Sequence, residues 1–396
     1  MRLFVLTAIV ALVPSGVVAA PVRLPSTVRV DVLSLLSPRR VELTSTASMR
    51  ISTGATLPAG ARLTIDIERR VLRARLNGRL VWQGPSLTVG SQGDVASVDV
   101  TGRNRRIRQL PAPVELSVHE NRIAIRVEFP LEELVASAVF AEMQGAREPA
   151  ALAAAAIAIR SYLGASRGRH AREGFDVCDS THCVHSIGRV SRDQPGASEA
   201  IDAVNATTGK ALIRDGHIVS GFINACCGGR TATPTELWAS EDTGDYTSVE
   251  CAWCRSSRYF SWTRVLTASS VAGALSDALD EPVRADFSLR TERIASGWVR
   301  SVQITGGIRD RRVDGDAFRM AIGRRLGWDS LPSPNFNVAR ERGSFVFRGA
   351  GFGHGIGLCL AGANELARRS KSAAEILEIY FPGVSVVSLP QVSGDV

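Results

Sequence analysis

The sequence predicts an α+β fold, with a β-rich N-terminal region over residues 24–128 and a mixed α/β region over residues 129–390. Three patterns along the 396-residue chain support this division. Apolar and polar residues alternate up to residue 129, helical periodicity begins at Pro130, and strand and helix patterns then intermix. The apolar fraction of 45% is that of a globular protein and excludes a chain that is disordered throughout.

Strands in the first region are predicted from alternation with a period of two. Valines alternate with polar residues over residues 28–32, and the same pattern recurs at residues 63–67 and 123–127. Asn77 and Gly78 lie between two further runs of this kind, and this pair is the preferred turn of a two-residue β-hairpin. The region is therefore expected to form a sheet structure.

The second region begins with two predicted helices. A proline suits the first turn of a helix over residues 131–143, and an alanine-rich run predicts a second helix over residues 148–166. Near the C-terminus, Ser372 and Glu375 form a capping box for a last helix that ends near residue 380. The other predicted elements are strands at residues 211–213, 217–223 and 299–305 and helices at residues 316–326 and 358–369.

The first residues predict an exported protein. Residues 1–20 combine a charged start, an apolar middle and a small-residue end, which is the pattern of a signal peptide. The apolar run is shorter than the roughly 20 residues that a membrane span needs. We therefore expect cleavage close to residue 20 and a mature protein in the periplasm or the cell wall.

The formal net charge of +8 favours an acidic partner, although general solubility would account for the same charge. In an exported protein, a polyanionic wall polymer is a better candidate than nucleic acid, which we do not expect as a partner. Basic residues cluster at Arg69 and Arg70, at Arg103, Arg105, Arg106 and Arg108, and at Arg309, Arg311 and Arg312.

One carboxylate occupies a position where the pattern predicts a core residue. Leu131, Val135 and Ala138 are spaced as one face of the first helix, and the next position on that face is Glu142. A carboxylate is rarely buried without a partner or a function. If the helix ends before Glu142, the side chain is simply solvated, and the pattern alone leaves both interpretations open.

A compact cluster of cysteine and histidine predicts one structural zinc ion. Cys178, His182 and Cys183 lie close together in the sequence, with His170 a little upstream. Two thiolates and two imidazoles make a suitable tetrahedral set of zinc ligands. In an oxidising compartment, a Cys178–Cys183 disulfide competes with this interpretation. We favour zinc, because His182 has no role in a disulfide.

The remaining cysteines leave several pairings open. Cys226, Cys227, Cys251 and Cys254 could also bind zinc, although adjacent cysteines chelate poorly compared with a Cys-x-x-Cys pair. The chain has seven cysteines, and an odd number leaves at least one of them free or bound to metal. We expect Cys359 to be this residue, buried on a helix.

Several motifs, found in the right order, resemble those of the SpoIID/LytB family. The resemblance spans roughly residues 28 to 385 and implies that residues 129–390 form a SpoIID-type catalytic domain with a cleft. The family includes lytic transglycosylases that act on glycan strands stripped of their stem peptides, alongside amidase enhancers. The motifs are Leu131-Glu132-Glu133-Leu134-Val135 with Ala141-Glu142-Met143, Ala155 with Ile157-Ala158-Ile159-Arg160-Ser161-Tyr162, Asp176-Val177-Cys178-Asp179-Ser180-Thr181-His182-Cys183, Cys227-Gly228-Gly229-Arg230-Thr231 with Glu236 and Trp238, Gly353-His354-Gly355-Ile356-Gly357-Leu358, and Phe381-Pro382-Gly383.

The resemblance implies that Glu142 is the catalytic residue of a peptidoglycan lytic transglycosylase. Such an enzyme uses the C6 hydroxyl of N-acetylmuramic acid as nucleophile and leaves a 1,6-anhydro ring, so one carboxyl group can act first as acid and then as base. A hydrolase normally needs a second carboxylate, for which Asp176, Asp179 and Glu236 are candidates. A glutamate at position 142 favours the enzyme over the alternative, a non-catalytic peptidoglycan-binding protein that stimulates an N-acetylmuramoyl-L-alanine amidase.

The matched motifs also imply substrate-binding residues. Gly353, His354 and Gly355 lie in a glycine-rich loop, and glycines allow a ligand to approach the backbone closely. Thr231 belongs to the Cys-Gly-Gly-Arg-Thr motif, and Arg160 on the second helix is expected to orient Glu142 or a sugar carboxylate. A tight turn and an ordinary exposed helix arginine are the commoner explanations of such residues.

The resemblance bears on the cysteines as well. Some family members hold zinc at the motif around Cys178. Relatives with a Cys-Gly-Gly motif often have a cysteine near the position of Cys254, which favours a Cys227–Cys254 disulfide with Cys226–Cys251 beside it.

Two positions depart from the family pattern. Leu360 stands where members often carry glutamine, and Val184-His185 stands where glutamine and an aromatic residue are common. Both changes remove polar groups that a sugar could use, so we expect differences in substrate detail.

Overall fold

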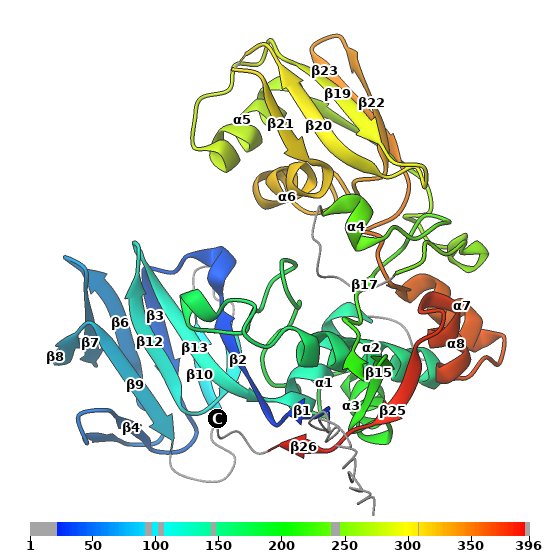
Figure 1. The fold of residues 1–396 in the computed structure, drawn as a ribbon. Helices are drawn as coiled ribbons and strands as arrows, with labels where there is room; N and C mark the ends of the chain where they lie inside the picture. The colour runs from blue at the N-terminus through cyan, green and yellow to red at the C-terminus, as the bar shows by residue number, and fades with distance from the viewer. Residues whose placement is uncertain are drawn as a thin grey trace, which may run out of the picture.

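The computed structural model describes residues 22–91, 97–101, 107–143, 148–238, 246–307 and 309–392. Figure 1 shows two β-sheets formed by the first third of the chain, helices beside them, and a further group of strands and helices that stands apart. The predicted signal peptide and Arg103, Arg105 and Arg106 lie outside the described residues. None of the described helices is long and apolar enough to span a membrane.

The larger N-terminal sheet has seven strands in the order β14-β2-β13-β12-β9-β4-β5. β2 (Thr27–Val32) pairs antiparallel with β13 (Arg122–Pro130) on one side. On the other side it pairs in parallel with β14 (Val177–Cys178), a short strand that comes from the second region. The remaining strands are β12 (Val114–His119), β9 (Ser86–Ser91), β4 (Met49–Ile51) and β5 (Thr56–Leu57).

The second N-terminal sheet has six strands in the order β11-β10-β3-β6-β7-β8. Asn77 and Gly78, both with positive φ, join β7 and β8 in the predicted hairpin. Alternate residues such as Leu63 and Ile65 are fully buried, as the period-two pattern predicts. The strands are β11 (Ile107–Pro111), β10 (Ser97–Thr101), β3 (Arg40–Thr44), β6 (Leu63–Glu68), β7 (Val71–Leu76) and β8 (Arg79–Gly84).

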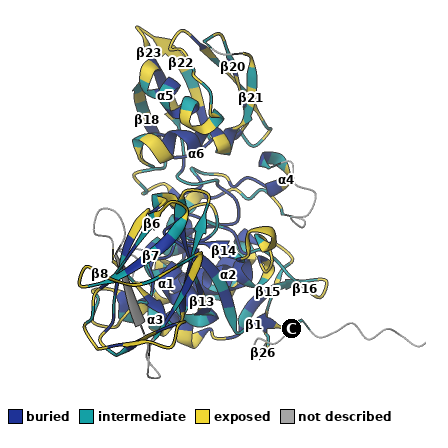
Figure 2. Cartoon of the chain, turned by 90° about the vertical axis from the view of Figure 1, so that its left-hand side faces the viewer, coloured by how far each residue is buried: buried dark blue, intermediate teal, exposed yellow. Residues whose placement is uncertain are grey.

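The helices pack around α2 (Pro149–Ala165), in which every residue from 154 to 163 is buried (Figure 2). Its alanine side chains are small, so α1 (Leu131–Glu142), α3 (Ala197–Ala206), α7 (Leu360–Arg368) and α8 (Ala373–Tyr380) all contact it. β13 leads directly into α1, and one continuous hydrophobic core joins the sheets to the helices. The boundary predicted near Phe129 therefore separates two sequence patterns that share a core.

Residues 262–349, here called the inserted domain, form a second core that the sequence did not predict. In Figures 1 and 2 this domain stands apart from the rest of the chain. Trp298 is an exception within it, because its side chain packs into the main core. The elements are β18 (Trp262–Thr267), β22 (Phe336–Glu341) and β23 (Ser344–Gly349) in one sheet, β19 (Ser288–Arg293), β20 (Val299–Thr305) and β21 (Arg311–Asp314) in another, and the helices α5 (Ala268–Leu279) and α6 (Gly315–Leu326).

The remaining elements are short. They are η1 (Ser34–Leu36), η3 (Ala171–Glu173), η4 (Ala252–Cys254), α4 (Pro234–Leu237), β1 (Leu24–Pro25), β15 (Lys210–Arg214), β16 (His217–Ile218), β17 (Ile223–Asn224), β24 (Leu358–Cys359), β25 (Ser385–Ser388) and β26 (Gln391–Val392).

The α+β prediction is confirmed, with local differences. The capping box at Ser372 and the helix that follows it are present. The strand predicted at residues 217–223 is broken between β16 and β17, where Gly221 lies so close to α2 that an added Cβ would be 2.0 Å from the carbonyl oxygen of Ala158. The helix predicted from residue 358 begins two residues later, because Leu358–Cys359 pairs with β17.

Candidate active site and cysteine clusters

Glu142 is the last residue of α1, and its side chain lines a cavity. Leu131, Val135 and Ala138 on the same face of the helix are buried, as predicted. The Glu142 side chain keeps an exposed fraction of 26%, because the core gives way to a cavity at this end of the helix. The helix therefore extends through Glu142 and holds the carboxylate half-buried, where a ligand can reach it.

The cavity lies where segments of the main core meet α6 of the inserted domain. Its enclosed volume is about 110 Å³, well below the roughly 300 Å³ at which whole-ligand pockets begin, so part of a sugar fits inside. Among the described residues that line it, Glu142 is the only carboxylate. The lining residues are Glu142, Ile159, Tyr162, Thr181, Cys183, Val184, His185, Gly221, Phe222, Ile223, Asn224, Ala225, Arg319, Phe352, Gly353 and His354.

His185 lies beside Glu142, with its Nδ1 3.5 Å from the Oε1 of the carboxylate. His185 belongs to the Val184-His185 pair that departs from the family pattern, and both residues line the cavity, so this departure places an imidazole beside Glu142. Leu360, the second departure, is 5% exposed at the start of α7 and is not among the described lining residues.

The three candidates for a second carboxylate lie outside the described lining and have structural partners. Asp176 accepts two backbone N–H groups, at 3.0 and 2.8 Å. Asp179 accepts one at 3.0 Å, and burial raises the pKa of Asp179 to about 6. Glu236 accepts the backbone N–H of Thr233 in the capping box of α4. These contacts explain the three carboxylates without a catalytic role.

His354 lies on the cavity wall and is held by the protein itself. Its Nδ1 accepts the backbone N–H of Ile356 at 3.1 Å. Burial lowers the pKa of His354 to about 4, and of the nearby charges Asp316 opposes this shift whereas Arg319 adds to it. The ring packs against Trp238, with the ring centroids 5.2 Å apart. His354 is therefore neutral at neutral pH and shapes the cavity without contributing a charge.

The glycines on either side of His354 are required for different reasons. Gly353 has φ +99° and lines the cavity, and an added Cβ would lie 3.3 Å from the Cβ of Asn224. Gly355 has φ +76°, and an added Cβ would lie 2.1 Å from the ring of Trp298. Gly353 therefore keeps the predicted position beside a ligand, whereas Gly355 accommodates a side chain of the inserted domain.

Arg160 and Thr231 are buried and are not among the described residues that line the cavity, so the structure does not support their predicted substrate contacts. The Arg160 side chain is 0% exposed, and its guanidinium donates to the Glu132 carboxylate at 2.6 Å and to the Lys210 carbonyl at 3.1 Å. Because every residue of α2 from 154 to 163 is buried, an arginine at position 160 cannot remain exposed. Thr231 is 2% exposed, and its hydroxyl accepts the backbone N–H of Val249 at 2.7 Å.

Tyr162 and Arg319 are among the polar residues of the cavity that were not predicted as site residues. Tyr162 belongs to the motif that contains Arg160, and burial raises its pKa to about 12, so the hydroxyl stays protonated. Arg319 on α6 is 5% exposed and donates from Nε to the Pro332 carbonyl at 2.9 Å. The motif around Tyr162 could have indicated the tyrosine, but only the fold brings Arg319 to Glu142.

The predicted zinc ligands come together beside the edge strand β14. Both His170 Nε2 and His182 Nδ1 lie 3.3 Å from Cys183 Sγ, and His182 Nδ1 lies 3.8 Å from Cys178 Sγ. The other ring nitrogen of His170 lies 2.5 Å from the Glu173 carboxylate, an arrangement common behind histidine ligands of zinc. Two sulfurs and two nitrogens at these separations fit a tetrahedral metal ion.

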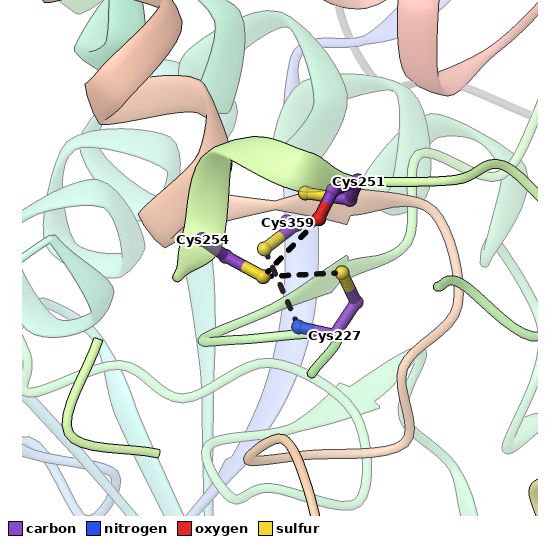
Figure 3. Close-up of side chains that lie close together, drawn as sticks. All are labelled: Cys227, Cys251, Cys254 and Cys359. Carbon is purple, nitrogen blue, oxygen red and sulfur yellow. Dashed lines mark hydrogen bonds between the residues drawn. The ribbon is translucent and has the colours of Figure 1, made fainter. Parts of the chain in front are cut away.

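All seven cysteines lie in the described part of the chain, and none forms a disulfide. The predicted Cys227–Cys254 bond is absent, since the two sulfurs are 3.7 Å apart, and so is the Cys226–Cys251 bond. Instead, the sulfurs of Cys227, Cys251, Cys254 and Cys359 lie within 4.8 Å of one another in a buried cluster that could hold a metal ion (Figure 3). Cys359 is therefore part of a cluster and is not the isolated thiol that we predicted.

Comparisons with known proteins match two regions of the chain. Residues 119–213 match the family model described as SpoIID, Stage II sporulation protein, and residues 252–357 match a domain of unknown function, DUF8618. The chain is 25% identical over 286 residues to Stage II sporulation protein D of Bacillus subtilis (strain 168), a match that covers 69% of this chain and 79% of the relative. It is 26% identical over 289 residues to the protein of the same name from Bacillus amyloliquefaciens, with the same coverage.

A third relative, an uncharacterized protein of Brachyspira hyodysenteriae, is 24% identical over 274 residues, which cover 67% of this chain and 69% of the relative. Glu142 and all four predicted zinc ligands lie within the residues that the SpoIID model matches, whereas Arg319 lies in the second match. The resemblance to the SpoIID family is therefore confirmed, and residues 119–213 of this chain are a SpoIID domain.

Proposed function

We propose that this protein is a lytic transglycosylase that cleaves the bond between N-acetylmuramic acid and N-acetylglucosamine in peptidoglycan glycan strands. The observation that carries the proposal is that Glu142 is the only carboxylate among the described residues lining the cavity. Cleavage by an internal nucleophile requires one carboxyl group, whereas hydrolysis normally requires two. The confirmed SpoIID resemblance supports stripped glycan strands as the substrate.

In the proposed reaction, Glu142 first donates its proton to the glycosidic oxygen as the bond from that oxygen to C1 of muramic acid breaks. The resulting carboxylate then accepts the proton of the C6 hydroxyl while the C6 oxygen bonds to C1. Water is not consumed, and Glu142 regains its proton in every cycle. His185, 3.5 Å from the carboxylate, is placed to hold it in position between the two steps.

Arg319 and Tyr162 provide two further polar groups of the proposed site. Each muramic acid of a stripped strand keeps a lactyl carboxylate, and a guanidinium matches the planar geometry of a carboxylate. Nε and Nη1 of Arg319 have hydrogen-bond partners, whereas Nη2 has none among the described residues. We propose that Arg319 binds this lactyl carboxylate and that the protonated hydroxyl of Tyr162 donates to a sugar oxygen.

We also propose that His170, Cys178, His182 and Cys183 hold one zinc ion. The donor atoms of His170, His182 and Cys183 lie within 4.8 Å of one another, and Cys178 Sγ lies 3.8 Å from His182 Nδ1. These separations support the proposal, as does the Glu173 carboxylate behind His170. Four protein ligands would leave no open position, so the ion would stabilise the loop that carries His185 and take no part in the chemistry.

The proposed setting of the protein is the periplasm or the cell wall, after export directed by residues 1–20. A net charge of +8 supports a polyanionic partner, and in that compartment a polyanionic glycan is a better candidate than nucleic acid. An N-acetylmuramoyl-L-alanine amidase is the natural second partner, because such an amidase supplies strands that lack stem peptides.

The test is to incubate purified protein with stripped glycan strands and to analyse the products by mass spectrometry. Native protein should release fragments with 1,6-anhydro ends. Glu142→Gln keeps the shape of the side chain but cannot carry the proton, so the rate should fall about a hundred- to ten-thousand-fold. Glu133→Gln is the matched control, since Glu133 lies on the same helix but pairs with Arg189 outside the described cavity lining, and its rate should be unchanged.

Reducing muramic acid ends would identify water as the nucleophile and refute the transglycosylase mechanism. Equal rates for the native protein and Glu142→Gln would exclude Glu142 as the acid and base. If neither protein cleaves strands while both bind them and accelerate an amidase, the protein is an amidase enhancer.

A further inference from the structure

The buried cysteine cluster is assembled from three distant segments of the chain (Figure 3). Cys251 and Cys254 form a Cys-x-x-Cys pair around the short helix η4. Cys227 precedes a turn at Gly228, which has φ +69°, and Cys359 is the N-cap residue of α7. The four residues are between 0% and 1% exposed, so the sulfurs lie in a dry interior.

The arrangement of the sulfurs fits one shared ion better than two covalent pairs. Four sulfurs placed about 2.3 Å from a tetrahedral zinc ion lie about 3.8 Å from one another. Cys227 Sγ and Cys254 Sγ are 3.7 Å apart, and every pair in the cluster lies within 4.8 Å. Two disulfides would each bring a pair of sulfurs to about 2.05 Å, and none of the four cysteines forms a disulfide.

Hydrogen-bond donors surround the sulfurs, as a site with several thiolates requires. The backbone N–H groups of Cys227 and Gly362 donate to Cys359 Sγ, at 3.3 and 3.4 Å. The Tyr380 hydroxyl lies 3.1 Å from Cys251 Sγ, where it can donate to a thiolate. Gly362 leaves space for this contact, because an added Cβ would lie 2.0 Å from that hydroxyl oxygen. Such donors disperse negative charge in a region that water does not reach.

We propose that Cys227, Cys251, Cys254 and Cys359 bind a second zinc ion, which joins the two ends of the inserted domain to the main core. The four thiols release their protons to solvent as the ion binds, and no electron transfer is involved. Four thiolate ligands leave no open coordination position, so the ion has a structural role.

The cluster lies close in sequence to both ends of the inserted domain, and this position indicates what the ion would hold together. Cys254 lies eight residues before β18, the first strand of the inserted domain, and Cys359 lies ten residues after β23, the last one. The backbone of Cys226, next to the ligand Cys227, exchanges two hydrogen bonds with Phe352. Phe352 lines the cavity two residues before His354. The ion therefore holds the segments through which the inserted domain and the His354 loop reach the cavity.

The test measures zinc in the full chain after export to an oxidising compartment and purification without chelator. Cys183→Ser removes a ligand of the first zinc site, so any zinc that remains reports on the second. We expect about one zinc ion per chain in this variant and none after Cys359→Ser is added. Cys226→Ala on the same background is the matched control, because Cys226 is buried beside the cluster but does not belong to it, and it should keep the zinc.

A second measurement covers the case in which the Cys359 variant does not fold. The denatured intact mass of the Cys183→Ser protein should correspond to six free thiols, and cobalt in place of zinc should give the intense charge-transfer band of a four-thiolate site. Chelation under native conditions should also make the two connecting segments susceptible to protease. A mass that is lower by two hydrogens per disulfide, iron in place of zinc, or zinc that persists after Cys359→Ser would each overturn the proposal.

Discussion

Replacing Arg160 by methionine tests the conclusion that this residue holds the core together and does not bind substrate. The substitution keeps an unbranched side chain of similar length but removes a guanidinium that is 0% exposed. It leaves the Glu132 carboxylate without its main partner and removes the donor to the Lys210 carbonyl. Breaking a buried ion pair in this way typically costs about 3–5 kcal/mol.

The structure indicates the lower end of that range. The Glu132 side chain is 24% exposed, and it also accepts a hydrogen bond from the side chain of Gln391 at 2.8 Å, so the remaining carboxylate can be partly hydrated. We therefore expect a loss of about 3 kcal/mol. For a cooperative unit of about 250 residues, this loss lowers the melting temperature by about 6 °C.

The assay is thermal unfolding followed by circular dichroism, with Arg189→Met as control. Arg189 pairs with Glu133 on the same helix, but the two side chains are 23% and 37% exposed, and pairs of this kind contribute about 0–1 kcal/mol. The control should therefore melt within about 2 °C of the native protein. If Arg160→Met melts like the native protein but no longer binds glycan strands, the inference from burial is wrong and the residue binds substrate.

Three further predictions concern the cavity and its surroundings. Arg319→Met should raise the KM for stripped strands at least tenfold and leave the KM unchanged for strands whose lactyl carboxylate is amidated; equal effects on both would exclude a carboxylate contact. Gly355→Ala should cost about 1–3 kcal/mol more than Gly343→Ala, since both glycines have positive φ but only the first would contact Trp298, and urea unfolding of the two variants measures the difference. Burial lowers the pKa of His354 to about 4, below its usual value of about 6.5. Between these two pH values the unfolded chain therefore binds more protons than the folded protein. As the pH drops from 7 to 4, the free energy of unfolding should fall by at most about 3 kcal/mol. His354→Gln should show a smaller fall in melting temperature over the same range, and an unchanged fall would assign the effect to other groups.

Local patterns predicted those parts of the fold in which neighbouring residues decide the structure. The Asn77-Gly78 hairpin, the two helices after Pro130 and the capping box at Ser372 depend on interactions within a few residues, and the structure contains all of them. The second core was not predicted, because the strand and helix patterns of residues 262–349 resemble those of the segments that build the main core.

The candidate site likewise contains residues that local patterns indicate and residues that only the fold brings together. The spacing of apolar residues on one helix was sufficient to indicate Glu142 as unusual, and the motif around Cys178 indicated that cysteine and histidine side chains would lie close together, as His170, His182 and Cys183 do. Arg160 was misjudged because the sequence does not show that residues 154–163 of its helix are all buried. Arg319 and the inclusion of Cys359 in a cluster depend on contacts between segments far apart in the sequence, which no local pattern reveals.

Because Cys251 and Cys359 lie close together, the segment between them could be replaced without moving the residues on either side. Their sulfurs lie within 4.8 Å of each other, so their Cα atoms are at most about 10 Å apart, a gap that about three extended residues could close. Residues 252–358 can thus be regarded as an exchangeable module, because the rest of the chain could be joined by a short link without them. Exchange of the module would leave Glu142 in place but would remove Arg319, Phe352, Gly353 and His354 from the cavity wall and Trp298 from the main core. Proteins with the same scaffold around Glu142 could therefore differ, through this one segment, in the ligand that their cavity accepts.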